Sequence, residues 1–240
     1  MIFNLLAPLA DGFPLFNLIR YTTFRAGAAC LTALVIALVL GPAVIGWLRG
    51  FQRGGQPIRA DGPERHLIEK KGTPTMGGVL ILLATVLATL LWIDLRNPLV
   101  WAVLLVTLGY GALGFADDWL KVTRRNTRGV SGRAKLVAQA AIGLLAATWI
   151  MLALPPAIAS GLAVPVFKDV LIPLGLLFPL MGMLVMMGAS NAVNLTDGLD
   201  GLAIVPAMIA AGVFALIAYL VGHRVMADYL QLHAVPGANE

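Results

Sequence analysis

The chain has 240 residues, of which 59% are hydrophobic and 12% are charged, and its mean hydropathy is +0.88. Soluble globular domains carry about twice that charged fraction, so the composition predicts an integral membrane protein. The net charge of +5 would suggest a nucleic-acid partner in a soluble protein. Because no basic face interleaved with aromatic residues supports that, we expect no nucleic acid, and we assign the Lys and Arg to topology and to contacts with lipid or phosphates.

Six uncharged stretches are long enough to cross a bilayer as helices, which takes about 20 residues. The first 19 residues contain Asp11 and two prolines and lack the basic start of a signal peptide, so we expect them to lie at the interface. Pro155-Pro156 ends a long apolar run near Leu154. The sequence predicts an all-α, polytopic membrane helical bundle forming one domain, with spans at about 26–48, 72–93, 97–116, 136–154, 170–189 and 201–222.

Basic residues gather in two of the predicted loops, 49–71 and 117–135. The positive-inside rule places both loops in the cytoplasm, and six spans then put both termini on the outer, periplasmic side. The loop at 189–200 is cytoplasmic by parity, although it has no Lys or Arg. These two loops hold twelve of the 17 basic residues: Arg49, Arg53, Arg59, Arg65, Lys70, Lys71, Lys121, Arg124, Arg125, Arg128, Arg133 and Lys135.

An acidic pair, Asp117-Asp118, follows the third predicted span. Carboxylates near lipid are usually functional or paired. Adjacent side chains on a helix diverge by about 100°, so one could bind a cation while the other meets a substrate group. Mg²⁺ takes a few carboxylates together with waters and substrate phosphates. The alternative interpretation is a solvated helix end with Lys121 as an i,i+3 or i,i+4 partner.

A second acidic cluster lies in the segment 190–201, where Asn194, Asp197 and Asp200 recur every three residues. On a helical turn they would line one side, and as two Asp-Gly steps they could form tight turns. A polar turn between two spans is the alternative. The topology puts this cluster on the same face as Asp117-Asp118, which suggests a site that handles metal and phosphate.

Two basic segments could bind phosphate on that face. The segment 59–78 combines basic residues and His66 with glycines, although an ordinary cytoplasmic loop would look similar. A zinc site is disfavoured because no other His is predicted on that side. The segment 128–135 places Lys135 at a helix N-terminus, where a bound anion would offset the unfavourable dipole interaction. A topological anchor is the alternative.

Together these segments resemble the phospho-N-acetylmuramoyl-pentapeptide transferases, a branch of the polyprenyl-phosphate N-acetylhexosamine-1-phosphate transferase superfamily. The stretches are KKGTPTMGG at 70–78, GFADDWLK at 114–121, KLVAQ at 135–139 and NAVNLTDGLDGLA at 191–203. The resemblance implies Mg²⁺-dependent transfer of phospho-MurNAc-pentapeptide from UDP-MurNAc-pentapeptide to undecaprenyl phosphate, giving lipid I and UMP. This is the first membrane step of peptidoglycan synthesis, on the cytoplasmic face of the bacterial inner membrane.

The resemblance also implies roles for the residues that match its motifs. Asp117 would be the base or orienting group for the lipid phosphate, with Asp118 in support of the catalytic site. Asp117, Asp118 and Asp197 would contribute to the metal site. The implied substrate-binding residues are Lys70, Thr75, Lys121, Lys135, Asn191, Asn194, Asp197, Gly198, Leu199 and Asp200.

Members of this family have ten transmembrane helices, whereas the chain ends after its sixth predicted span. The family's third essential aspartate and its histidine-rich loop lie beyond that point, so we expect a fragment with an incomplete metal site. A non-catalytic truncated membrane protein is the alternative.

Three other functions compete with this interpretation. A sibling GlcNAc-1-phosphate transferase would share the aspartates, but the segment 70–78 argues against it. A transporter would place its acidic residues near span centres, whereas the acidic clusters of this chain are predicted at span ends and on one face of the membrane. A function as a scaffold for other membrane proteins would not explain why the Asp and Asn residues are clustered. The oligomeric state, a homodimer included, stays open.

Overall fold

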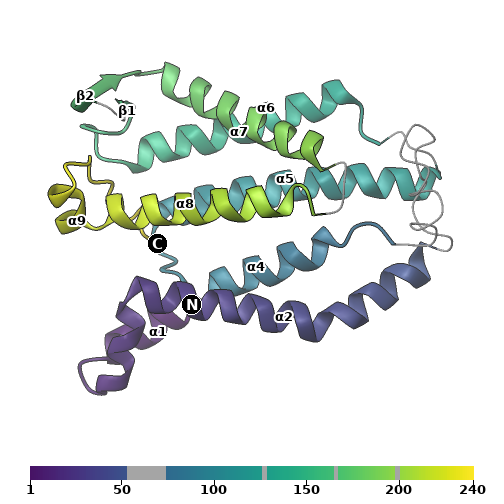
Figure 1. The fold of residues 1–240 in the computed structure, drawn as a ribbon, viewed down its shortest axis with the longest axis horizontal. Helices are drawn as coiled ribbons and strands as arrows, with labels where there is room; N and C mark the ends of the chain where they lie inside the picture. The colour runs from purple at the N-terminus through teal and green to yellow at the C-terminus, as the bar shows by residue number, and fades with distance from the viewer. Residues whose placement is uncertain (53–73, 126–128, 165–166, 198–200) are drawn as a thin grey trace. The chain divides into compact units, whose positions relative to one another are not determined.

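The computed structural model describes residues 1–52, 74–125, 129–164, 167–197 and 201–240 (Figure 1). The chain divides into two compact units. The first unit contains residues 1–93 and 107–138, and the second contains residues 94–106 and 139–240.

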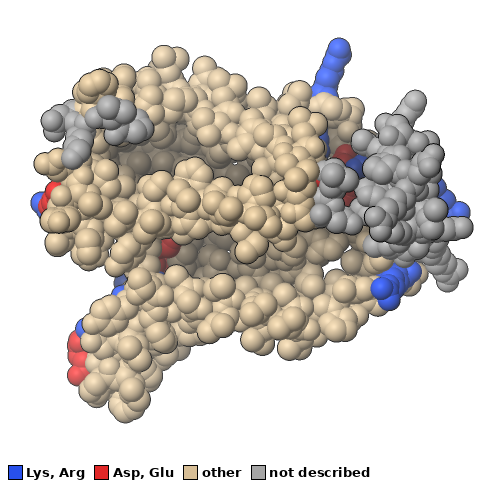
Figure 2. Space-filling view, viewed as in Figure 1, with Lys and Arg blue, Asp and Glu red and all other residues tan. Residues whose placement is uncertain are grey.

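The described residues are mostly helical. Five helices (α2 and α5 to α8) are long and apolar enough to cross a membrane, and α4 is a shorter apolar helix. Figure 2 shows the long sides of the helices almost entirely in tan, with charged residues near helix ends. This confirms the predicted polytopic helical membrane protein. The elements are α1 Ile2–Leu6, η1 Ala7–Leu9, η2 Pro14–Arg20, α2 Thr22–Phe51, α4 Gly78–Trp92, α5 Pro98–Arg124, α6 Gly132–Ala153, β1 Gly161–Val164, β2 Phe167–Pro173, α7 Leu177–Thr196, α8 Ile204–Gly222 and α9 Arg224–Tyr229.

In the first unit, α2 and α4 pack side by side (Figure 1). Ala84 and Ala88 lie four residues apart on α4 and are both buried, so small side chains form its packing face. The helix begins at Gly78, later than the predicted span 72–93, because Met76 has a positive φ of 71° that interrupts helical geometry. Residues 72–73 of that span lie outside the described residues.

Positively charged groups contact the C-terminal end of α4. The Met1 ammonium donates to the Leu90 carbonyl at 2.6 Å, and the buried Arg25 donates to the Trp92 carbonyl at 3.4 Å. Cations at a helix C-terminus are favourable because the last carbonyls carry partial negative charge. The N-terminal residues therefore secure α4 at the end away from Thr75.

In the second unit, the prediction of one helical span over 170–189 is wrong at its start. Phe167–Pro173 form strand β2, which pairs antiparallel with β1, and α7 begins only at Leu177. The segment Val170-Leu171-Ile172 is apolar and partly β-branched, and periodicity alone cannot distinguish such a run from a helix. The expected helix end near Leu154 is confirmed, since α6 ends at Ala153 before Pro155-Pro156.

Candidate functional site

Helix α5 carries the acidic pair beyond its apolar part. Its first residue, Pro98, follows Asn97, whose Oδ1 accepts the Leu99 N–H at 2.9 Å. From Pro98 to Ala116 the helix is uncharged and covers about 28 Å, close to the ~30 Å of a bilayer's hydrocarbon core. The helix continues to Arg124. The carboxylates therefore lie within a continuous helix, at the boundary of its apolar part.

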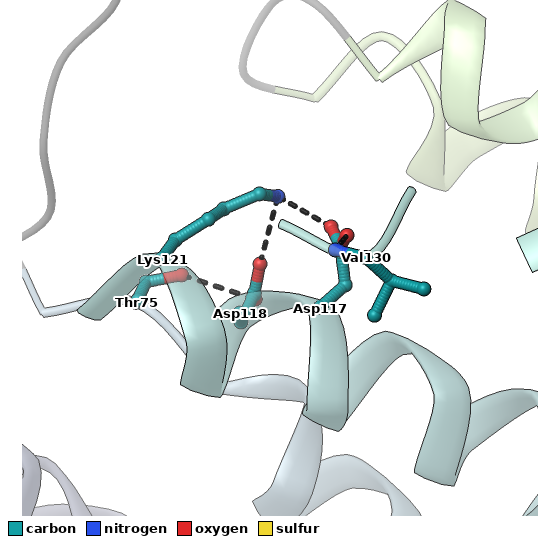
Figure 3. Close-up of polar contacts among 5 residues, drawn as sticks. All are labelled: Thr75, Asp117, Asp118, Lys121 and Val130. Carbon is teal, nitrogen blue, oxygen red and sulfur yellow. Dashed lines mark hydrogen bonds and ion pairs between the residues drawn. The ribbon is translucent and has the colours of Figure 1, made fainter. Parts of the chain in front are cut away.

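Lys121 bridges the two carboxylates. Its Nζ lies 2.5 Å from Oδ2 of Asp117 and 3.3 Å from Oδ1 of Asp118. Figure 3 shows the ammonium reaching both side chains from one turn farther along α5. The side chains of Asp117 and Asp118 are 15% and 35% exposed. The pairing with Lys121 that the alternative interpretation predicted is thus present, although the two carboxylates are not fully solvated. The pairing makes two divergent side chains converge on one cation.

Asp117 is also tied to the segment that enters α6. Its Oδ1 accepts the Val130 N–H at 2.8 Å. Gly129 packs so closely that a Cβ there would lie 2.7 Å from Cγ of Asp117. Lys135, in the first turn of α6, attracts the same carboxylate electrostatically. In this structure the anion that offsets Lys135 near the helix start is therefore Asp117.

Asp118 is supported from another segment. Its Oδ2 accepts the Thr75 hydroxyl at 3.3 Å, and Thr75 lies just before α4 (Figure 3). The backbone of Thr75 in turn pairs with the side chain of Gln52 at the end of α2. Sequence reasoning identified Thr75 but missed Gln52, because a single polar residue beside a basic loop carries no motif.

The second group of candidate residues lies on α7, in the other compact unit. Asn191 donates to Oε1 of Gln139 on α6 at 2.8 Å and to the Met187 carbonyl at 2.8 Å. Gln139 is 2% exposed and also donates to the Ser190 hydroxyl at 3.4 Å. The Asn191 amide therefore joins α6 to α7.

Asn194 and Asp197 follow Asn191 along the same helix. Asn194 is in the last turns of α7 and Asp197 is its C-cap residue, with both side chains exposed. The backbone N–H of Asp197 still donates to the Val193 carbonyl. Of the two predicted conformations, a helical turn or tight Asp-Gly turns, the helical one therefore holds from Asn194 to Asp197. Four candidate residues lie outside the described residues: Lys70, Gly198, Leu199 and Asp200.

The described residues contain no group of three or more His, Cys, Asp and Glu side chains that could hold a metal ion. Asp117 and Asp118 nevertheless direct one oxygen each to a common cation, Lys121. Two carboxylates are a usual protein contribution to a Mg²⁺ site, where waters and substrate phosphates complete the shell. The pair therefore fits part of such a site.

Comparisons with known proteins identify the family. A model described as glycosyl transferase family 4 matches residues 100–237, and a phospho-N-acetylmuramoyl-pentapeptide-transferase signature matches residues 70–82. The chain is 69% identical over its full length to the phospho-N-acetylmuramoyl-pentapeptide-transferase of Granulibacter bethesdensis and covers 66% of that protein. It is 56% identical to the enzyme of that name in Maricaulis maris, of which it covers 67%.

The chain belongs to the phospho-N-acetylmuramoyl-pentapeptide-transferase family.

Family membership confirms the resemblance drawn from the four sequence stretches. A third relative of the same name, from Gluconobacter oxydans, is 58% identical and covers the whole chain. The chain spans 66% of the length of the Granulibacter and Gluconobacter proteins, just under two thirds.

Proposed function

We propose that the Asp117–Asp118–Lys121 cluster belongs to the active site of a transferase that moves phospho-MurNAc-pentapeptide from UDP-MurNAc-pentapeptide to undecaprenyl phosphate. The products are lipid I and UMP. The observation that carries the proposal is the convergence of two carboxylates on one cation at the apolar boundary of α5, in a chain of this family.

In this reaction an oxygen of the lipid phosphate attacks the β-phosphorus of the donor, the one that bears the sugar, and UMP leaves. Such a transfer needs positioning and charge neutralisation more than covalent chemistry. The Lys121 ammonium supports this role because it is 29% exposed and can exchange a carboxylate for a phosphate oxygen. Asp117, fixed by Val130 N–H, would orient the incoming groups.

Mg²⁺ is part of the proposal. Asp117 and Asp118 would hold it, and Mg²⁺ would supply charge neutralisation for the donor pyrophosphate. An attacking phosphate is largely ionised at neutral pH, so Asp117 need not act as a strong base. Its two anchoring contacts favour an orienting role.

We place this site on the cytoplasmic face of the bacterial inner membrane. The concentration of Lys and Arg in the segments 49–71 and 117–135 supports this orientation. A reporter active only in the periplasm, fused after Arg125, should give no signal, whereas the same reporter fused after Arg96 should give a strong one. The opposite pattern would reverse the orientation.

The donor is tested by UMP release. The chain, and a version extended to the length of its relatives, would be incubated with undecaprenyl phosphate, Mg²⁺ and either UDP-MurNAc-pentapeptide or UDP-GlcNAc. The proposal predicts UMP from the muramoyl donor only. The match of the muramoyl signature to residues 70–82 favours this outcome over a GlcNAc-1-phosphate transferase. UMP from UDP-GlcNAc alone would favour that sibling function instead.

A further inference from the structure

We infer that Gln52 is a positioning residue for the acidic site, acting on Asp118 through Thr75. Gln52 lies directly after α2, where its backbone N–H donates to the Leu48 carbonyl and caps the helix. Its side chain is directed into the protein, and the residue is 4% exposed. A buried side-chain amide normally has hydrogen-bond partners, so the identity of those partners indicates its task.

Both ends of the Gln52 amide bind the same residue. Its Oε1 accepts the Thr75 N–H at 2.8 Å, and its Nε2 donates to the Thr75 carbonyl at 3.0 Å. This pairing is like one rung of a β-ladder and fixes the position and direction of the Thr75 backbone. Asn is too short to span the same distance in the same geometry, and Glu lacks the donor.

The fixed backbone aims the Thr75 side chain at the acidic pair. The Thr75 hydroxyl lies 3.3 Å from Oδ2 of Asp118, whose other oxygen faces Lys121. The neighbouring residue of α2, Phe51, stacks on Trp119 of α5 at a centroid distance of 5.1 Å. The end of α2 therefore contacts Asp118 through Thr75 and contacts the next residue, Trp119, directly.

The consequence is a division of roles around Asp118. Lys121 lies on α5 together with Asp118, so its contact cannot fix Asp118 relative to the rest of the protein. Thr75 contacts Asp118 from outside α5 and can do so. Groups at a catalytic centre must be held within about 0.5 Å, by side chains that are themselves held by hydrogen bonds. Gln52 supplies that second layer for Asp118 without touching any reacting group.

A cross-linking experiment tests the positioning independently of catalysis. Thr75→Cys and Asp118→Cys are combined in a Cys30→Ala background. The rate of disulfide formation at a fixed concentration of added thiol oxidant reports how closely the two segments are held. Gln52 binds the backbone of residue 75, so its contacts survive the Thr75→Cys change. Adding Gln52→Met should slow the cross-link about tenfold, the effect of losing two hydrogen bonds.

The matched control is Gln139→Met, which removes an equally buried amide from the other compact unit. It should leave the cross-linking rate unchanged. If Gln52→Met does not give a folded protein, Gln52→Glu keeps the acceptor for the Thr75 N–H and should give an intermediate rate. A rate equal to that of the parent pair in either Gln52 variant would overturn the inference.

A kinetic experiment, which rests on the proposed function, tests the path through Thr75. In a version extended to the length of its relatives, Gln52→Met should lower kcat about tenfold and change KM for the donor less than about twofold. In a Thr75→Val background the same change should have no further effect, because the hydroxyl it positions is gone. Additive losses would contradict the inference. If the parent has no transferase activity, the proposed function fails, and the cross-linking result still decides the role of Gln52.

Discussion

Replacing Lys121 by Met removes the only cation that contacts both carboxylates in the described part of the site, while it preserves most of the side chain's apolar length. The structure gives the distances that determine the effect: 2.5 Å from Nζ to Asp117 and 3.3 Å from Nζ to Asp118. The two contacting carboxylate oxygens are therefore no more than about 6 Å apart. Without the ammonium, two negative charges face each other at that separation.

The magnitude follows from Coulomb's law. Two unit charges about 6 Å apart repel by about 3 kcal/mol at an effective dielectric constant of about 20, and by under about 1 kcal/mol in bulk water. Asp118 is 35% exposed, so solvent screens the interaction toward the lower value. We expect Lys121→Met to lower the free energy of unfolding by about 1–2 kcal/mol.

Magnesium should reverse this loss. Mg²⁺ and the ammonium compete for the same two oxygens, so removing Lys121 should tighten Mg²⁺ binding about tenfold, which corresponds to about 1.4 kcal/mol. The assay is the midpoint of thermal unfolding in detergent, measured across a Mg²⁺ titration, because a ligand that binds the folded state raises this midpoint. Lys121→Met should respond to lower Mg²⁺ concentrations than the parent chain.

Arg20→Met is the matched control. Arg20 forms an ion pair with Asp11 at 2.8 Å, with both side chains well exposed, so its loss should change stability little and leave the Mg²⁺ response unaltered. If Lys121→Met unfolded at the parent temperature and responded to Mg²⁺ no more strongly than Arg20→Met, the two carboxylates would not form a shared cation site.

Further predictions concern the contacts that hold the candidate residues. Gly129→Ala should lower the thermal unfolding midpoint and any transferase activity, because its Cβ would lie 2.7 Å from Cγ of Asp117. Val130→Ala keeps the backbone N–H that binds Asp117, so it should be nearly neutral in both measurements. Asn191→Leu should lower the free energy of unfolding by about 1–2 kcal/mol in a denaturant titration, because the buried Gln139 loses its 2.8 Å partner. Gly182→Val should destabilise the packing of α6 on α7, since a Cβ at Gly182 would lie 2.8 Å from that of Ala147; Gly188→Ala, where a Cβ meets open space, is its control in the same titration.

The membrane helices could be predicted from sequence because a single physical requirement controls them. A span needs a long charge-free segment, and five such segments form helices of sufficient length and hydropathy. The hairpin of β1 and β2 could not be predicted in this way. Its apolar, partly β-branched residues after Asp169 satisfy the same hydropathy criterion as a helix. Its pairing joins residues that are distant in sequence, such as Gly161 with Pro173.

The candidate site could be predicted as a set of residue types but not as a set of contacts. The spacing of Asp117, Asp118 and Lys121 gave their helical pairing directly. The contacts of Asp117 with Val130 N–H and of Asp118 with Thr75 depend on how separate segments fold against α5. A backbone N–H donor has no signature in the sequence, and Gln52 becomes visible only through the Thr75 backbone that it binds.

The most direct test of the central claim is UMP release by carboxylate variants. A version extended to the length of its relatives would be given UDP-MurNAc-pentapeptide, undecaprenyl phosphate and Mg²⁺. Asp117→Asn, Asp118→Asn and Asp197→Asn would be compared with the parent. We expect each variant to lose at least about 10²-fold in rate, the scale of a missing electrostatic or acid–base contribution. Near-parental UMP release by Asp117→Asn and Asp118→Asn would show that the cluster on α5 is not part of the active site.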